Sequence, residues 1–220
     1  MSHIYPIDDG FIRLVDAMGC DMSVVRAARV SYGNDSKGED ADLKLIHYLM
    51  KHNHGTPFEH IVFTFHVKCP MFVARQWFRH RIGSFNEISG RYTELDTGFF
   101  VPTTFRKNNN ENHQSSVEGD FTSQETESML NEYNYALEIM ESTYKSLLDK
   151  GVAREQARAI LPLGTYTEFY WTVNLRSLLN FIRLRTAEDA QAEMQQYANL
   201  IHSIAEEKAP WCFEAFESEV

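Results

Sequence analysis

The sequence predicts one α+β domain with more helix than strand, and three observations lead to this fold class. Segments with apolar residues at helical spacing alternate irregularly with short runs rich in β-branched and aromatic residues. No repeat of fixed period and no convincing linker divides the 220 residues. With 43% apolar and 24% charged residues, the composition is that of a globular chain, not of a disordered or fibrous one.

The first two elements that the pattern indicates, from residue 22 onward, are helices. Residues 22–30 form a short apolar-periodic segment, and residues 41–52 carry leucines and isoleucines every three or four positions. We therefore expect a helix in each. The following segment, HGTPFEH at residues 54–60, contains Gly55 and Pro57, which interrupt a helix.

The middle of the chain predicts the sheet. Residues 61–68, IVFTFHVK, are β-branched and aromatic and indicate a strand, and a helix is expected over residues 71–79. Residues 84–92 are typical of a loop or a strand, and residues 98–105 are a further short strand candidate. The polar stretch at residues 106–120 predicts a mobile loop.

A long helix is expected next. Thr122 and Glu125 have the spacing of a capping box, which opens a helix that runs to residue 150. Gly151 ends it. Residues 153–161 predict a short helix that stops before Pro162.

The last third returns to the sheet once and then stays helical. Residues 166–173 resemble a strand, and residues 175–185 a helix. Thr186 with Asp189 has the spacing to cap a final helix over residues 188–208.

The charge of the chain is unevenly distributed. The formal net charge is −10, and residues 108–144 contain eight acidic residues and no Lys or Arg. By contrast, residues 71–92 contain four arginines against one acid, Glu87. A local positive cluster in an acidic chain suits a small anionic ligand, whereas the acidic remainder argues against long polyanions and anionic membranes.

The cysteines and the N-terminus point to a reduced, cytoplasmic compartment. Cys20, Cys69 and Cys212 are odd in number and widely spaced, which argues against a disulfide framework and a zinc ribbon. The first ten residues lack the basic stretch and apolar run of a signal peptide. No apolar run approaches the roughly 18 residues that a membrane span needs.

The densest group of charged and hydrogen-bonding side chains is RHRIGSFNEISGRY, residues 79–92. Arginine offers a planar fork of donors that matches phosphate and imide oxygens. Serines, Asn86 and Glu87 add short-range donors and acceptors, and two glycines allow close backbone approach. The segment therefore suits a nucleotide. The alternative is a solvated, salt-bridged surface loop.

Two further groups of polar side chains are weaker candidates for a ligand site. Residues 174–185, NLRSLLNFIRLR, place three arginines and two asparagines on an apolar helix, which fits either a ligand site or an amphipathic helix with a wet face. In residues 152–162, Arg154 and Arg158 are four apart, and the spacing favours a solvated helix face. Three histidines flank the Gly-Thr-Pro turn without a completing fourth ligand, which argues against zinc: His52, His54 and His60.

Arg79-His80-Arg81, followed after seven residues by Ser89, resembles the RHR-x₇-S signature of the flavin-dependent thymidylate synthases, the ThyX family. The resemblance runs roughly from residue 24 to residue 216. Its other motifs are TPFEH at residues 56–60, ARQWFRHR at 74–81, ARxxLP at 157–162 and the helix at 174–185. It implies a single domain over residues 1–220, with a central antiparallel sheet and long helices, in a homotetramer whose active sites lie between subunits.

The resemblance also implies a reaction. Members of this family reductively methylate dUMP to dTMP for dTTP biosynthesis. Methylenetetrahydrofolate supplies the carbon, NADPH supplies the electrons, and bound FAD relays them. No enzyme cysteine attacks the uracil, which agrees with the absence of a thiol from the arginine-rich segments.

Individual roles follow from the same resemblance. Arg185 is expected to be catalytic, by promoting ionisation of the uracil, and Arg158 to reach dUMP from another subunit. Asp189 departs from the family, in which some members have His before Ala-Gln, so no flavin contact is assigned to it. The residues expected to bind dUMP are Gln76, Arg79, Glu87, Ile88, Ser89, Gly90, Arg91, Arg158 and Arg185. Those expected to bind FAD are Ser31, His54, Thr56, Arg79, His80, Arg81, Glu87, Asn174, Leu175, Arg176 and Asn180.

Three other classes of function remain open on the residues alone. The first is another flavin or nucleotide enzyme with the same anion pocket. The second is a non-catalytic sensor that binds dUMP without turnover. The third is a single-strand nucleic-acid binder that stacks bases on Trp77, Phe78, Phe85 and Tyr92, against which the net charge of −10 argues.

Overall fold

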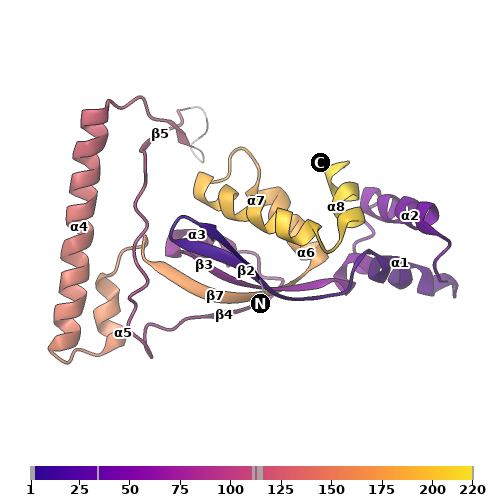
Figure 1. Ribbon diagram of the computed structural model, residues 1–220, viewed down its shortest axis with the longest axis horizontal. Helices are drawn as coiled ribbons and strands as arrows, with labels where there is room; N and C mark the ends of the chain where they lie inside the picture. The colour runs from indigo at the N-terminus through magenta and orange to yellow at the C-terminus, as the bar shows by residue number, and fades with distance from the viewer. Residues whose placement is uncertain (1–2, 34, 111, 113–115, 220) are drawn as a thin grey trace.

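A five-stranded antiparallel sheet crosses the molecule, and helices pack on one of its faces (Figure 1). The structure is a computed structural model that describes residues 3–33, 35–110, 112 and 116–219. Glu111 of the acidic run and residues 113–115 of the polar stretch therefore lie outside the described residues. The predicted α+β class and its central antiparallel sheet are confirmed.

The strands of this sheet have the spatial order β1–β2–β3–β7–β4. β3 and β7 pair along their whole lengths, from Val62 opposite Asn174 to Pro70 opposite Tyr166, and form the centre of the sheet. A separate hairpin pairs β5 with β6. The strand bounds are β1 (Ile4–Ile7), β2 (Gly10–Met18), β3 (Val62–Pro70), β4 (Ser84–Glu87), β5 (Arg106–Asn108), β6 (Ser116–Glu118) and β7 (Tyr166–Asn174).

The helices differ widely in length, and none of those in the described residues is both long and apolar enough to cross a membrane. The α-helices are α1 (Asp21–Arg29), α2 (Glu39–Lys51), α3 (Met71–Trp77), α4 (Ser123–Asp149), α5 (Arg154–Ala157), α6 (Leu175–Arg185), α7 (Ala192–Glu206) and α8 (Pro210–Glu217). Three short 3₁₀ turns join them: η1 (Val30–Tyr32), η2 (Thr56–His60) and η3 (Arg158–Ile160).

The two faces of the sheet differ because strand side chains alternate. In β3, Phe63, Phe65 and Val67 are fully buried against the helices, as are Phe169 and Trp171 of β7. The intervening side chains lie on the other face, which we call the open face because Figure 1 shows no helix over it. This division is typical of an antiparallel sheet with one packed and one wet side.

Trp77 joins three elements in the core. Its ring lies 5.3 Å from Trp171 of β7, 5.4 Å from Phe169 and 4.9 Å from Phe181 of α6, measured between ring centroids. Aromatic contacts of this kind add to the free energy of burial and have defined geometry. They place the residues that follow α3, beginning at Arg79, beside the end of α6.

Most predicted helices are confirmed within a few residues, including the capping box. The Thr122 N–H donates to Glu125 Oε2 at 2.8 Å, and the Glu125 N–H donates to Thr122 Oγ1 at 3.3 Å. The strands expected at residues 61–68 and 166–173 are β3 and β7. At residues 84–92 the chain forms both expected structures, the strand β4 and then a loop.

Three expectations were wrong. Residues 98–105 make only one isolated bridge, from Phe99 to Thr165, because Pro102 has no N–H to continue a ladder. The polar stretch at residues 106–120 contains β5 and β6 and is not simply a loop. The last long helix begins at Ala192 rather than at residue 188, because Thr186 closes α6 by donating to the Ile182 carbonyl at 2.9 Å.

Candidate functional site

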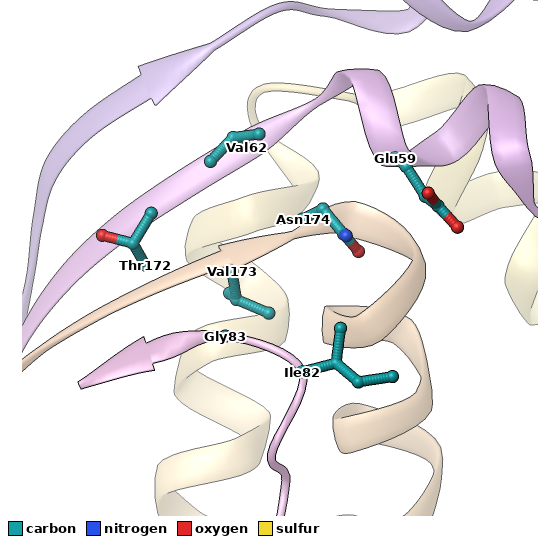
Figure 2. A pocket seen from close by; sticks show the side chains of 7 residues that line it. All are labelled: Glu59, Val62, Ile82, Gly83, Thr172, Val173 and Asn174. Carbon is teal, nitrogen blue, oxygen red and sulfur yellow. The ribbon is translucent and has the colours of Figure 1, made fainter.

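A shallow hollow of about 250 Å³ lies where β3 begins, β7 ends and the chain enters β4 (Figure 2). Figure 2 shows the lining residues converging on the hollow, and they come from three segments that are distant in sequence: 59–62, 82–83 and 172–174. The lining residues are Glu59, Val62, Ile82, Gly83, Thr172, Val173 and Asn174. Val62 and Asn174 are register partners in neighbouring strands, so the pairing of β3 with β7 fixes the floor of the hollow.

The wall of the hollow is formed by η2 and the first turn of α6. Arg176 donates to Glu59 Oε1 at 2.7 Å and ties these elements together. A Cβ on Gly55 would lie 2.4 Å from Arg176 Nε, so a side chain at this position would push the Arg176 side chain aside. Asn174 caps α6, because its Oδ1 accepts from the Ser177 N–H at 2.9 Å.

Arg185, at the end of α6, is held by two acceptors from the α3 region. Its Nε donates to His80 Nε2 at 2.9 Å, and its terminal nitrogen donates to the Gln76 carbonyl at 3.2 Å. Burial lowers the pKa of Arg185, and the nearby Arg79 cation lowers it further. We call Gln76, Arg79, His80 and Arg185 the α3–α6 group.

His80 accepts this hydrogen bond with a neutral ring. Burial, and then the Arg185 cation, lower the pKa of His80 to about 4. An imidazole that accepts at Nε2 carries its proton on Nδ1. At neutral pH, therefore, His80 orients the guanidinium of Arg185 without adding a charge beside it.

A series of hydrogen-bonded side chains, which we call the polar chain, leads from Gln76 through Gln191 and Glu193 to Arg106. Gln76 Nε2 donates to Gln191 Oε1 at 2.5 Å, and Gln191 Nε2 donates to Glu193 Oε2 at 2.8 Å. Arg106 of β5 donates to the other oxygen of Glu193 at 2.6 Å. The side chain of Glu193 is only 12% exposed. The hairpin β5–β6 is thus linked through three side chains to the α3–α6 group.

A second set of expected nucleotide contacts lies in the loop after β4. Glu87 accepts from the Thr167 hydroxyl at 2.7 Å, and Arg91 is paired with Glu155 of α5 at 3.3 Å. A Cβ on Gly90 would lie 2.7 Å from Leu95 and 3.2 Å from Arg158 Cδ, so Gly90 and Arg158 are neighbours. We call residues 87–91 with Arg158 the β4-loop group.

The expected dUMP contacts therefore fall into two separate groups within one chain. Among the described residues, no hydrogen bond or ion pair joins the α3–α6 group to the β4-loop group. Each group leaves arginines exposed, Arg79 in the first and Arg91 in the second. Either group by itself presents only part of an anion site.

The expected FAD contacts are only partly gathered at the hollow. Thr56 belongs to η2, and Arg81 directly precedes the lining residue Ile82. His54 is exposed beside Tyr48, and Ser31 is exposed in η1, away from the lining residues. The Leu175 side chain is fully buried and its N–H donates to the Ile61 carbonyl. Asn180, one turn beyond Arg176, accepts from Arg183 at 3.2 Å.

Some residues of the hollow and of the polar chain were not singled out from the sequence. Glu59 and Ile82 line the hollow, and Gln191 and Glu193 form the polar chain. Glu59 lies inside the TPFEH motif and Ile82 directly follows RHR, so the motifs themselves could have indicated both. The role of Gln191 depends on a contact 115 residues away in sequence, which no local pattern shows.

The thiols lie outside this geometry. Cys69 and Cys212 are fully buried. Burial, with the nearby Glu87 carboxylate, raises the pKa of Cys69 well above its usual value, and burial with Asp21 raises that of Cys212. Such thiols are poor nucleophiles. Cys20 is exposed beside the start of α1.

Two arginine-bearing groups and a hollow on an α+β scaffold are the features that a binding site for a small anionic ligand needs. The family described as "Thymidylate synthase complementing protein" matches residues 13–211. The chain belongs to this family, as its relatives also show. It is 57% identical over 210 residues to a flavin-dependent thymidylate synthase of Thermosipho africanus, covering 96% of this chain and 92% of the relative.

A second relative and a solved structure agree. The flavin-dependent thymidylate synthase of Thermus thermophilus is 51% identical over 211 residues, which are 96% of this chain and 77% of the relative. The crystal structure of a UMP/dUMP methylase, PolB from Streptomyces cacaoi, bound with 5-Br UMP, has a TM-score of 0.87 and 35% identity. It covers 98% of this chain and 97% of that one. The likeness therefore extends over the whole fold.

Proposed function

We propose that this chain, as one domain, converts dUMP to dTMP by reductive methylation and so supplies dTTP biosynthesis. Methylenetetrahydrofolate would give the carbon and NADPH the electrons, through bound FAD. The observation that carries the proposal is Arg185, a half-buried cation held in place by His80 and the Gln76 carbonyl. The names of the relatives, and the methylase PolB with its bound uridine nucleotide, support the same reaction.

The hollow is the proposed FAD site. Its lining comes from the three segments in which flavin contacts are expected: η2, the turn after Arg81, and the start of α6. The donor set fits a dinucleotide, because Arg81 has no ion pair and the Nδ2 of Asn174 has no partner among the described residues. Arg176 would add a second cation only by exchanging its contact with Glu59 for one with the ligand. When bound there, FAD would supply the two electrons, taken from NADPH, that reduce the transferred one-carbon unit to the methyl group of dTMP. The hollow is open and small, so a further subunit would have to complete it.

The two arginine-bearing groups are the proposed dUMP site. Arg79, Arg91 and Arg158 would bind the phosphate, with Ser89 and the Gly90 backbone as further donors. Gln76 and Arg185 would face the uracil. Because Arg158 lies beside Gly90 in the same chain, an Arg158 that comes from another subunit must bring the rest of the β4-loop group with it.

Arg185 would favour the ionised form of the uracil imide. A cation about 4 Å from the developing anion is worth roughly 4 kcal/mol at an intermediate dielectric, before desolvation subtracts a part. Ionisation makes uracil C5 a better carbon nucleophile. This route needs no cysteine, in agreement with the burial of Cys69 and Cys212.

A homotetramer in the cytoplasm completes the proposal. The open face of the sheet and the exposed apolar side chains of α4, Tyr135 and Ile139, are surfaces that a second copy would cover. The acidic helix α4 would then be a subunit contact rather than a wholly solvated face. We propose neither a nucleic acid nor a membrane as partner.

The test is dTMP formation from dUMP, methylenetetrahydrofolate and NADPH, with FAD present and with FAD stripped. FAD-dependent product is expected. A folded protein that binds dUMP and FAD without product would instead be a sensor, or would use a different carbon or electron donor. An oligonucleotide titration at two salt concentrations tests the nucleic-acid alternative, for which strong, salt-dependent binding would be required.

A further inference from the structure

The polar chain from Arg106 to Gln76 has a fixed direction. Glu193 accepts with both carboxylate oxygens, from Arg106 at 2.6 Å and from Gln191 at 2.8 Å. A carboxylate that is paired in this way only accepts, so Gln191 must turn its NH₂ to Glu193 and its carbonyl oxygen to Gln76. Gln76 must in turn donate to Gln191, and its own Oε1 keeps no partner among the described residues.

Gln76 is tied to Arg185 through its backbone as well. The Gln76 carbonyl accepts from Arg185 at 3.2 Å, so the same residue holds Arg185, the proposed uracil contact, with its main chain and binds Gln191 with its side-chain amide. An amide in a half-buried position can rotate by 180° unless its neighbours fix it. Here the fixing neighbour, Gln191, comes from the segment just before α7, and its orientation depends on Glu193.

We propose that Gln191 and Glu193 are positioning residues for the nucleotide: they fix the Gln76 side-chain amide for dUMP, and Arg106 makes the β5–β6 hairpin part of this arrangement. The inference rests on the proposed function, since it deepens the role of Gln76 in that site. Neither Gln191 nor Glu193 is expected to touch substrate. Their effect passes through Gln76.

Glu193→Gln removes the fixed direction with little change in shape. The introduced amide would offer its carbonyl to Arg106 and its NH₂ to Gln191, so Gln191 would accept at this contact and the amides of both Gln191 and Gln76 would invert. We expect the Kd for dUMP of the FAD-loaded protein, measured by calorimetry, to rise about tenfold, the effect of losing one well-placed hydrogen bond. FAD content and Tm should stay unchanged. Arg106→Ala, which leaves the Glu193–Gln191 contact in place, should raise the Kd by about threefold.

A double-mutant cycle separates positioning from a general structural effect. In a Gln76→Ala background, Glu193→Gln should have no further effect on the Kd for dUMP. Gln191→Met interrupts the polar chain without removing the Glu193–Arg106 pair. If Glu193→Gln fails to fold, Gln191→Met should still raise the Kd for dUMP, and it should have no further effect in the Gln76→Ala background. Glu188→Gln is the matched control, because Glu188 is an exposed acid of the same connection without a hydrogen bond or ion pair among the described residues.

The outcomes distinguish this inference from the proposed function. Wild-type protein that binds no dUMP overturns the proposed substrate, and the positioning role with it. Wild-type protein that binds dUMP, with unchanged Kd in Glu193→Gln and Gln191→Met, overturns the positioning role alone. An equal loss in the presence and absence of the Gln76 side chain also overturns it, because the effect would then not pass through Gln76.

Discussion

Arg185 owes its position to hydrogen bonds rather than to ion pairs. Its guanidinium donates to His80 and to the Gln76 carbonyl, and no carboxylate pairs with it among the described residues. Neutral acceptors orient the cation and leave its charge uncompensated, which is the state needed to stabilise an anion in a ligand. The nearby Arg79 adds to the local positive potential.

Removing this cation should reduce catalysis far more than cofactor binding. We expect Arg185→Ala to lower kcat by about a hundredfold or more, since the cation stabilises charge that develops during the reaction. FAD content, measured by absorbance of the purified protein, should remain within about twofold of wild type. Arg183→Ala on the same helix is the control and should keep normal turnover. A normal kcat in Arg185→Ala would contradict the ionisation role.

His80 gives the folded protein a pH dependence of known sign. Its pKa is lowered from 6.5 to about 4, so between these values the unfolded chain binds a proton that the folded chain does not. The free energy of unfolding therefore falls as the pH drops through this window. His80→Gln keeps an acceptor for Arg185 and removes the titration. Denaturant unfolding at several pH values should show a shallower acid-side decline for the variant than for wild type. Parallel declines would contradict the assignment.

Sequence motifs were informative at the residue scale only where neighbours in sequence are also neighbours in the site. The segment at residues 79–92 and the helix at 174–185, which the sequence singled out, supply Arg79, Arg91 and Arg185 to the two groups described above. Gln191 and Glu193 were not, because their contacts with Gln76 and Arg106 form only when α7 packs beside α3 and the hairpin. Which side chains are buried with a partner is a property of packing, and spacing along the chain does not contain it.

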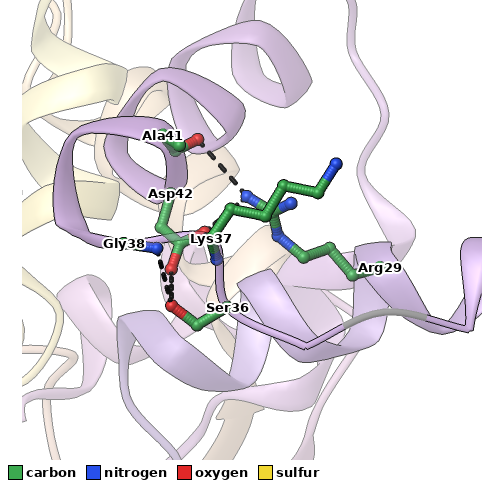
Figure 3. A network of polar contacts seen from close by, with 6 residues as sticks. All are labelled: Arg29, Ser36, Lys37, Gly38, Ala41 and Asp42. Carbon is green, nitrogen blue, oxygen red and sulfur yellow. Dashed lines mark hydrogen bonds and ion pairs between the residues drawn. The ribbon is translucent and has the colours of Figure 1, made fainter.

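Among the elements, α1 and α2 are joined by a buried ion pair (Figure 3). Figure 3 shows Asp42, near the start of α2, meeting Arg29 of α1 and the loop between them. Asp42 is 1% exposed and accepts from Arg29 at 2.5 Å, from the Ser36 hydroxyl at 2.5 Å and from the Lys37 N–H at 3.3 Å. Burial would raise the pKa of Asp42, but the three hydrogen bonds outweigh it and lower the pKa below its usual value.

Breaking this pair should destabilise the protein strongly. Asp42→Ala leaves Arg29 buried without its carboxylate, and we expect a loss of about 3 kcal/mol in the free energy of unfolding. The comparison is Glu141→Ala, which removes the exposed pair with Lys145 on α4 and should leave the free energy of unfolding almost unchanged. Urea unfolding measures both. Losses of similar size would mean that the Asp42 network adds nothing beyond a surface ion pair.

Element boundaries show which local signals were reliable. The capping box at Thr122 was correct because both partners lie within one turn. The cap expected from Thr186 was wrong because its hydroxyl is used by the preceding helix. Helix α8 was not predicted from the sequence. Its N-terminal N–H groups at Trp211 and Cys212 donate to the carboxylate of Asp21, which is about 190 residues away in sequence. A cap supplied by tertiary structure leaves no local pattern.

On the scale of the whole molecule, the open face of the sheet and the split site have one explanation. The open face holds polar pairs such as Thr64 with Thr172 at 3.0 Å, and it is wet in the isolated chain. Among the described residues, no hydrogen bond or ion pair joins the arginines of the α3–α6 group to those of the β4-loop group. If copies of the chain assemble, the first group of one subunit and the second group of another can form one complete dUMP site.

Subunit complementation tests this arrangement directly. Arg185→Ala impairs the α3–α6 group and Arg158→Ala the β4-loop group, so each variant alone should be nearly inactive. In an assembly formed from equal amounts of both, a site between two subunits receives both intact groups in about a quarter of cases, and activity should recover to about that fraction. Arg185→Ala mixed with Arg185→Gln is the control, because both changes remove the same cation and the mixture should stay inactive. An inactive Arg185→Ala and Arg158→Ala mixture, from variants shown by native mass spectrometry to exchange subunits, would place the complete site within one chain.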